Sequence, residues 1–204
     1  MIKLTFILLS LFLFFNNPVF GAVIPQNIIL TIDLCPSSHS YEKTLFQTLE
    51  NFSQQQGRAT PVVICVSGRW LDHHQKELTE IKKLKLDITW ANHSYEHPID
   101  HGFCTNPKFD FVGDLKKNEA TMIKYGLKPS KYYRFPGLVA NKTRLKQLSD
   151  LGYTVLGADV WLGKGQKIKD GAIVLIHGNG NELPGIVEKF MALLKSNQVK
   201  IISL

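Results

Sequence analysis

Two histidines four residues apart carry the first chemical signal in this chain. His93 and His97 lie in the segment Asn-His-Ser-Tyr-Glu-His-Pro, residues 92–98. A neutral imidazole is a nitrogen ligand for zinc, and this spacing places both rings on one side of a helical turn. Histidines at this spacing also occur in polar surface turns, so the pair indicates a metal site only if other polar groups converge on it.

Four more side chains that can do chemistry each follow a short apolar segment. They are Asp33, Arg134, Asp159 and His177. Any one of them alone is typical of a capping or loop residue. At the carboxyl ends of parallel strands, however, they would supply an acid, a base and a cation beside two metal ligands. The combination predicts a hydrolytic site.

The elements that must position these residues alternate along the chain. Apolar segments typical of strands occur at 27–32, 60–66, 87–91, 132–135, 154–158, 172–176 and 200–204. Apolar residues with helical spacing occur at 41–55, 75–84, 111–125, 142–151 and 183–194. Strands that alternate with helices predict an α/β fold with a parallel sheet, open or closed as a barrel, and helices outside it.

The first 21 residues have the composition of a secretory signal peptide. Lys3 precedes an apolar segment, residues 4–15, that is short for a membrane span, and small residues precede Ala22. An uncleaved membrane anchor is the alternative. We expect one domain over residues 22–204, exported to the periplasm, the cell wall or the medium, with no stable membrane insertion after cleavage.

The net charge of the chain limits the kinds of partner that it is expected to bind. The formal net charge is +7, and lysine-rich segments such as 82–85 and 164–169 contain no interleaved aromatic residues. A basic exported protein is attracted to anionic surfaces such as cell-wall polymers or lipid headgroups. No motif for nucleic-acid binding accompanies the charge, so we expect no nucleic-acid partner.

Three cysteines permit at most one disulfide within the chain. Cys65 lies in an apolar segment, which favours a buried free thiol. Cys35 and Cys104 each follow a segment of the expected site, so a Cys35–Cys104 bridge is the pairing to test.

Four segments together resemble the successive motifs of the polysaccharide deacetylases, the NodB-homology domains of carbohydrate esterase family 4. They are Thr31-Ile32-Asp33, residues 93–98, Arg134-Phe135-Pro136-Gly137 and Leu175-Ile176-His177. They follow the family's order and span nearly the whole mature chain. The resemblance implies a single-domain, distorted (β/α) barrel with fewer than eight strands, and metal-dependent removal of N-acetyl or O-acetyl groups from sugars.

The resemblance also implies roles for the metal and base residues. His93 and His97 would hold a divalent metal, with zinc as the first expectation. Asp33 resembles the general base that takes a proton from water, and Arg134 resembles the residue that orients this base.

The remaining matched residues would serve the acid and the pocket. His177 resembles the general acid, with Asp159 as a candidate for holding its imidazolium. The backbone N–H of Gly137 would help to stabilise the oxyanion. Trp161 and Leu175 would line a small pocket for the acetyl methyl group, although ordinary core packing explains these two residues equally well.

The sequence departs from the family pattern after the first strand. The family usually has two adjacent aspartates there, the second being the carboxylate ligand of the metal, whereas Asp33 is followed by Leu34 and Cys35. This Asp-Leu-Cys pattern resembles a variant that occurs among family members. The third ligand would then be Asp33 itself, His39 or Glu42, or the site would bind metal weakly or not at all. Glu42 is the preferred substitute, and a carboxylate in the first turn of a helix is its alternative role.

Three classes of function follow from the sequence. The first is a metal-dependent deacetylase of cell-wall or extracellular glycans. The second is a degenerate relative that binds sugar without turnover, because Leu34 stands where a metal ligand is expected. The third is a structural envelope protein. The retained Asp33, Arg134 and His177 favour the enzyme, while the glycan and the oligomeric state stay open.

Overall fold

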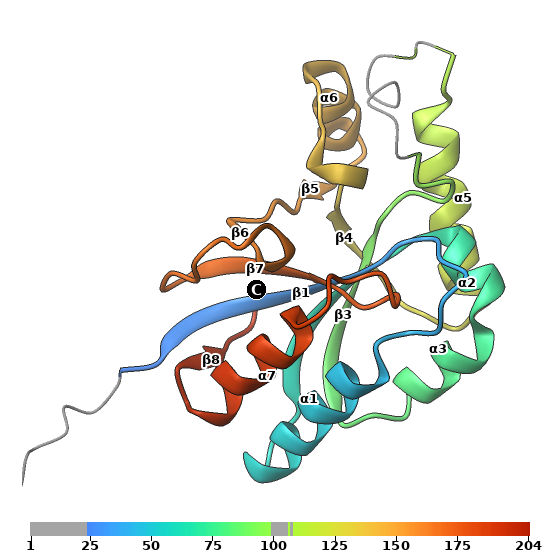
Figure 1. Cartoon of the computed structure of the whole chain (residues 1–204). Coiled ribbons are helices and arrows are strands. Elements are labelled where there is room, and N and C mark those ends of the chain that lie inside the picture. The colour runs from blue at the N-terminus through green and yellow to red at the C-terminus, as the bar shows by residue number, and fades with distance from the viewer. Residues whose placement is uncertain (1–23, 99–105, 107) are drawn as a thin grey trace, which may run out of the picture.

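A curled parallel sheet forms the centre of the computed structural model, which describes residues 24–98, 106 and 108–204 (Figure 1). The sheet order is β5-β4-β3-β2-β1-β7-β6, and β8 pairs with β1. The strands are β1 (Gln26–Leu34), β2 (Thr60–Val66), β3 (Leu86–Asn92), β4 (Pro129–Tyr133), β5 (Thr154–Val155), β6 (Val160–Trp161), β7 (Ala172–His177) and β8 (Val199–Ile201). The curled sheet confirms the expected α/β fold, a distorted and incomplete (β/α) barrel.

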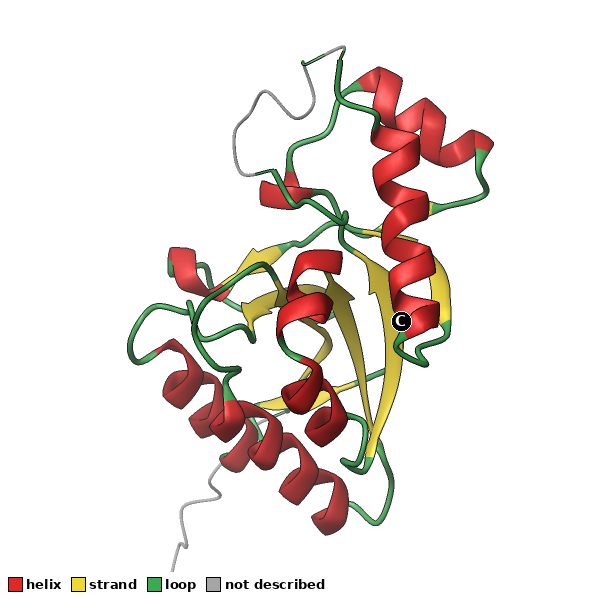
Figure 2. Cartoon of the chain, turned by 90° about the vertical axis from the view of Figure 1, so that its right-hand side faces the viewer, coloured by secondary structure: helices red, strands yellow, loops and turns green. Residues whose placement is uncertain are grey.

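Helices alternate with the strands and cover the outside of the sheet (Figure 2). They are α1 (Lys43–Gln55), α2 (Gly68–His73), α3 (Gln75–Ile81), α5 (Phe111–Lys124), α6 (Lys142–Asp150) and α7 (Ile186–Lys195). Two short 3-10 turns, η1 (Pro136–Leu138) and η2 (Leu162–Lys164), follow β4 and β6. In the described part of the chain, no helix combines the length and apolar composition needed to cross a membrane.

Strand β1 separates two apolar layers because its side chains alternate between the faces of the sheet. Ile28, Leu30, Ile32 and Leu34 are at most 1% exposed and belong to the core that also contains the buried residues of α1 and α7. The alternate residue Ile29 packs against the inner cluster around Val63 and Cys65. Asp33 shares the parity of Ile29, so it points toward the interior of the curled sheet.

Parallel register brings the expected site residues together. Asp33 pairs with Cys65 of β2 on one side and with His177 of β7 on the other. Hydrogen bonding between β2 and β3 continues beyond the end of β3, where the His93 N–H donates to the carbonyl of Val66, the last residue of β2, at 3.2 Å. The carboxyl ends of these strands therefore meet at one rim, as the sequence predicts.

The structure differs from the sequence prediction at one unpredicted helix and at one shortened strand, each for an identifiable reason. The sequence did not predict α2, which is only six residues long and begins where the Ser67 side chain accepts a hydrogen bond from the Trp70 N–H. The strand predicted over 154–158 ends at Val155. The carbonyls of Leu156 and Gly157 instead accept hydrogen bonds from the buried Arg134 guanidinium.

Candidate active site

A cavity of about 160 Å³ at the rim of the sheet contains most of the predicted site residues. Its lining consists of Asp33, Cys35, His93, His97, Gly137, Leu138, Trp161, Leu175 and His177. Arg134 lies behind Asp33, with its side chain fully buried. Glu42 and Asp159 are not part of this lining.

Asp33 and Arg134 form a buried ion pair at the base of the cavity. The Arg134 Nη1 donates to Asp33 Oδ1 at 3.0 Å and to Thr31 Oγ1 at 2.9 Å. Burial opposes ionisation of Asp33, but the Arg134 charge and the neighbouring histidines outweigh it and hold the pKa of the carboxyl below its usual value. Asp33 Oδ2 lies 3.7 Å from His93 Nε2, so a fixed carboxylate faces the histidine pair.

The histidine pair presents nitrogen lone pairs to the same cavity. In the tautomer that carries its proton on Nδ1, His93 donates to the Arg134 carbonyl at 2.9 Å, which leaves Nε2 as an acceptor. The two Nε2 atoms lie 3.1 Å apart. Burial lowers the pKa of His93, and burial together with the His93 charge lowers the pKa of His97 to about 3. Both rings are therefore neutral near pH 7, as metal ligation requires.

Asp114 of α5 fixes the loop that carries these histidines. Its carboxylate accepts hydrogen bonds from the Ser94 hydroxyl at 2.6 Å and from the N–H groups of Tyr95 and Glu96 at 2.9 Å each. Ser94 and His97 adopt positive φ angles of 65° and 48°, which are uncommon for residues other than glycine. Sequence reasoning missed Asp114, since its position in an amphipathic helix does not reveal its partners.

Cys35 is the third side chain with a donor atom for a metal that the structure places at the histidine pair. Donor atoms of Cys35, His93 and His97 all lie within 4.8 Å of one another. Burial and the Asp33 charge raise the pKa of the Cys35 thiol, so binding of a metal ion by its sulfur would release a proton. One sulfur and two imidazole nitrogens suit zinc and similar transition metals rather than magnesium or calcium.

The structure does not bring Glu42 or His39 to the group formed by Cys35, His93 and His97. Glu42 precedes α1, where its N–H donates to the Gly178 carbonyl at 2.9 Å, and it is absent from the metal-binding group. His39 Nδ1 lies 2.7 Å from Asn181 Oδ1 on the surface. Cys35 is a free thiol in the structure, and its expected pairing with Cys104 is not tested because Cys104 lies outside the described residues.

Glu182, not Asp159, holds His177. The carboxylate of Glu182 accepts from the His177 N–H at 2.9 Å and lies 3.4 Å from His177 Nδ1. Burial opposes protonation of His177, but the hydrogen bond to Glu182 and the Asp33 charge raise the pKa of the imidazole. The exposed Asp159 accepts a hydrogen bond from the Ile173 N–H at 2.8 Å instead.

A Glu182→Gln substitution is expected to move the alkaline limb of the activity profile to lower pH. Glu182 and Asp33 favour the protonated imidazole of His177 and Arg134 opposes it, so removing the Glu182 charge lowers the His177 pKa. The acid form is then lost at a lower pH. Measuring kcat against pH checks this shift, with Asp159→Asn as the matched control. A shift in the control and none in Glu182→Gln would contradict the assignment.

The wall of the cavity combines an aromatic ring, an aliphatic side chain and a tight turn. The Trp161 ring centroid lies 5.5 Å from that of His177, and Leu175 is 2% exposed. Gly137 adopts a φ angle of 61° within η1, directly followed by Leu138 at 60°. The predicted pocket residues Gly137, Trp161 and Leu175 therefore do lie around one small cavity.

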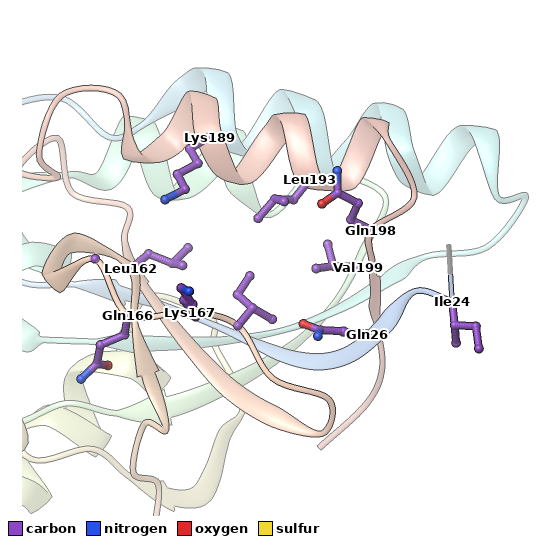
Figure 3. A pocket seen from close by; sticks show the side chains of 11 residues that line it. Ile24, Gln26, Leu162, Gln166, Lys167, Lys189, Leu193, Gln198 and Val199 are labelled. Atoms are coloured by element: carbon purple, nitrogen blue, oxygen red, sulfur yellow. The ribbon is translucent and has the colours of Figure 1, made fainter. Parts of the chain in front are cut away.

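A larger hollow of about 680 Å³ adjoins this cavity. The two share Cys35, His97 and His177, and the hollow adds polar side chains from Arg69, Glu96, Asn179 and Asn181. A separate hollow of about 320 Å³ lies between α7, β8 and the segment after β6 (Figure 3). Its lining contains no histidine, cysteine or carboxylate. The side chains that suit acid–base or metal chemistry line the cavity at the rim of the sheet instead.

Comparison with known proteins agrees with this fold. A buried carboxylate, a histidine pair and a third histidine lie together at the rim of the curled parallel sheet. The family model described as polysaccharide deacetylase matches residues 21–156. The chain belongs to the polysaccharide deacetylase family.

Solved structures with low sequence identity share the fold. The catalytic domain of a peptidoglycan N-acetylglucosamine deacetylase from Eubacterium rectale is 17% identical, with 90% of this chain and 93% of that chain covered and a TM-score of 0.64. A family 4 carbohydrate esterase from Bacillus anthracis is 20% identical, with coverage of 88% and 80% and a TM-score of 0.62. A family pseudoenzyme from the same organism is 15% identical, with coverage of 88% and 64% and a TM-score of 0.61.

Proposed function

We propose that this protein is a metal-dependent hydrolase that removes acetyl groups from N-acetylated or O-acetylated extracellular glycans. The observation that carries the proposal is the convergence of three groups on one small cavity. These groups are a buried carboxylate, a neutral histidine pair and a second, partly exposed histidine. A divalent metal held by His93 and His97 would supply a Lewis acid and an acidified water.

Asp33 is the general base in this proposal. The Arg134 guanidinium fixes Oδ1, and Oδ2 faces the histidine pair, where the attacking water would lie. As the water oxygen forms a bond to the acetyl carbonyl carbon, its proton passes to the Asp33 carboxylate. Gly137 lines the same cavity, and its backbone N–H would stabilise the developing oxyanion.

His177 is the general acid. Its ring lies in the cavity, 20% of its side chain is exposed, and Glu182 favours its protonated form. When the bond between carbonyl carbon and leaving group breaks, the imidazolium gives its proton to the sugar amine or hydroxyl, and acetate is released. Trp161 and Leu175 form the apolar side of the cavity that would receive the acetyl methyl group.

The adjoining polar hollow is the proposed site of the glycan. Amide and charged side chains such as Arg69, Asn179 and Asn181 suit the hydroxyl groups of a sugar chain. The expected signal peptide, residues 1–21, lies outside the described residues, and we propose export because cell-wall or extracellular polymers are the proposed substrates. The net charge of +7 favours association with anionic polymers.

A sugar-binding relative without turnover is the second candidate. Leu34 occupies the position where the family has its carboxylate ligand, and its side chain is buried in the core. One structural relative is described as a pseudoenzyme. This candidate predicts glycan binding with no acetate release at any metal concentration.

Acetate release from a panel of N-acetylated and O-acetylated glycans tests the proposal. We expect release that requires added zinc or cobalt and that a His93→Ala variant loses, because the variant removes a ligand with its Nε2 in the cavity. Release unaffected by chelation would contradict metal dependence. Glycan binding without release across the panel would favour the second candidate.

A further inference from the structure

We propose that Cys35 is the third protein ligand of the metal and binds it as a thiolate, so that the site is Cys-His-His. This inference rests on the metal dependence of the proposed function. It assigns a sulfur ligand where the family pattern supplies a carboxylate, and it explains how a chain with Leu34 keeps a three-ligand site.

Strand geometry places Cys35 on the correct side of the sheet. Side chains alternate between faces along β1, so the residue after Asp33 points into the core and the next one returns to the cavity. Leu34 is 0% exposed within the main core, and Cys35 lines the cavity together with Asp33. A ligand two residues after Asp33 therefore faces the histidines.

The distances agree with a tetrahedral zinc site. Bond lengths of about 2.3 Å to sulfur and about 2.0–2.1 Å to nitrogen imply ligand separations of about 3.6 Å for S···N and about 3.4 Å for N···N. Cys35 Sγ lies 3.6 Å from His93 Nε2, and the two histidine Nε2 atoms lie 3.1 Å apart. Two of the three donor pairs are therefore close to the separations that such a site needs, and all three donors lie within 4.8 Å of one another.

The backbone of Cys35 is held in place independently of its sulfur. Asn179 Nδ2 donates to the Cys35 carbonyl at 3.1 Å, and Pro36 fixes the next φ angle. Cys35 lines both the cavity and the adjoining polar hollow, so a cation that enters through either space would reach this residue.

Other donors near the pair have different roles. Asp33 Oδ1 accepts a hydrogen bond from Arg134, and Oδ2, 3.7 Å from His93 Nε2, is the proposed base for the attacking water. His39 lies beside Asn181 on the surface. Among the residues that the structure describes, Cys35, His93 and His97 are the group of histidine, cysteine and carboxylate side chains that meets the spacing for a metal. A thiolate in this set favours zinc and cobalt over hard cations such as magnesium.

Cobalt spectroscopy tests the ligand directly. Titrating the purified protein with Co²⁺ is expected to produce a thiolate-to-cobalt charge-transfer band in the near ultraviolet. The band is expected to persist in Cys65→Ala and Cys104→Ser, which leave Cys35 in place. Cys35→Ser is expected to lose the band and to bind less metal, while Cys35→Asp is expected to bind cobalt without the band, because a carboxylate replaces the sulfur.

The results separate the ligand assignment from the proposed function. A band that survives in Cys35→Ser, or bound cobalt without a band in the native protein, overturns Cys35 as the ligand even if acetate is released. Failure of the native protein to take up cobalt also overturns it. A Cys35-dependent band without acetate release from any glycan supports the ligand and counts against the deacetylase.

Discussion

An Asp33→Asn variant is expected to release acetate about 10²–10⁴-fold more slowly than the native protein. Asparagine keeps an oxygen that can accept the Arg134 hydrogen bond, which is 3.0 Å long in the native protein, but its amide cannot take a proton from water. The loss should therefore fall on kcat, while glycan binding is retained. Acetate release normalised to the folded fraction, together with glycan affinity, measures the two effects separately.

An exposed carboxylate of α6 provides the matched control for this variant. Asp150 pairs with Lys146 on the surface, with 60% of its side chain exposed. Asp150→Asn removes the same charge far from any proposed proton transfer and is expected to leave the rate unchanged. Equal rates for Asp33→Asn and the native protein would remove Asp33 from the mechanism.

An Arg134→Met variant is expected to lose about 3–5 kcal/mol of unfolding free energy, because it leaves the Asp33 carboxylate buried without its partner. The Arg134 side chain is 0% exposed and that of Asp33 is 4% exposed, so water cannot replace the missing cation. The substitution also leaves Thr31 Oγ1 and the carbonyls of Leu156 and Gly157 without a donor. Urea unfolding of the two proteins measures the loss.

Two further variants separate the ion pair from general effects of losing a cation. Lys131 lies on β4, which ends one residue before Arg134, and 61% of its side chain is exposed in its pair with Glu119. Lys131→Met is therefore expected to cost no more than about 1 kcal/mol. Adding Asp33→Asn to Arg134→Met is expected to recover part of the lost stability, because the lone carboxylate disappears. No recovery would show that the cost does not arise from the ion pair.

The sequence could predict the convergence of the site because the signal is local at each strand end. Asp33, His93, Arg134 and His177 each follow an apolar segment, and parallel register alone brings such positions to one rim. The same reasoning could predict Cys35, since it lies two residues after Asp33 and directly follows the strand. The prediction instead treated Cys35 as a disulfide partner and Glu42 as the ligand.

The partner of His177 could not be read from the sequence. Asp159 follows an apolar segment and matches the family's pattern only in part, since a single aspartate precedes Trp161. The pairing of β6 with β7 directs the Asp159 carboxylate to the Ile173 N–H. Glu182 follows β7 in a loop whose turn returns the carboxylate to the backbone and ring of His177. A contact made by a loop that folds back depends on backbone angles that residue types alone do not specify.

Arg134 contributes both to the stability of the fold and to the geometry of the site. One guanidinium joins β1 to the segment after β5, and the carbonyl of the same residue holds the His93 ring. Selection for a stable fold would therefore retain this arginine, the Asp33 beside it and the orientation of His93 even in a descendant that no longer turns over substrate. His177 is 20% exposed, whereas the Arg134 side chain is fully buried. Among relatives of this chain that have lost activity, we therefore expect the residue equivalent to His177 to be replaced before the residue equivalent to Arg134.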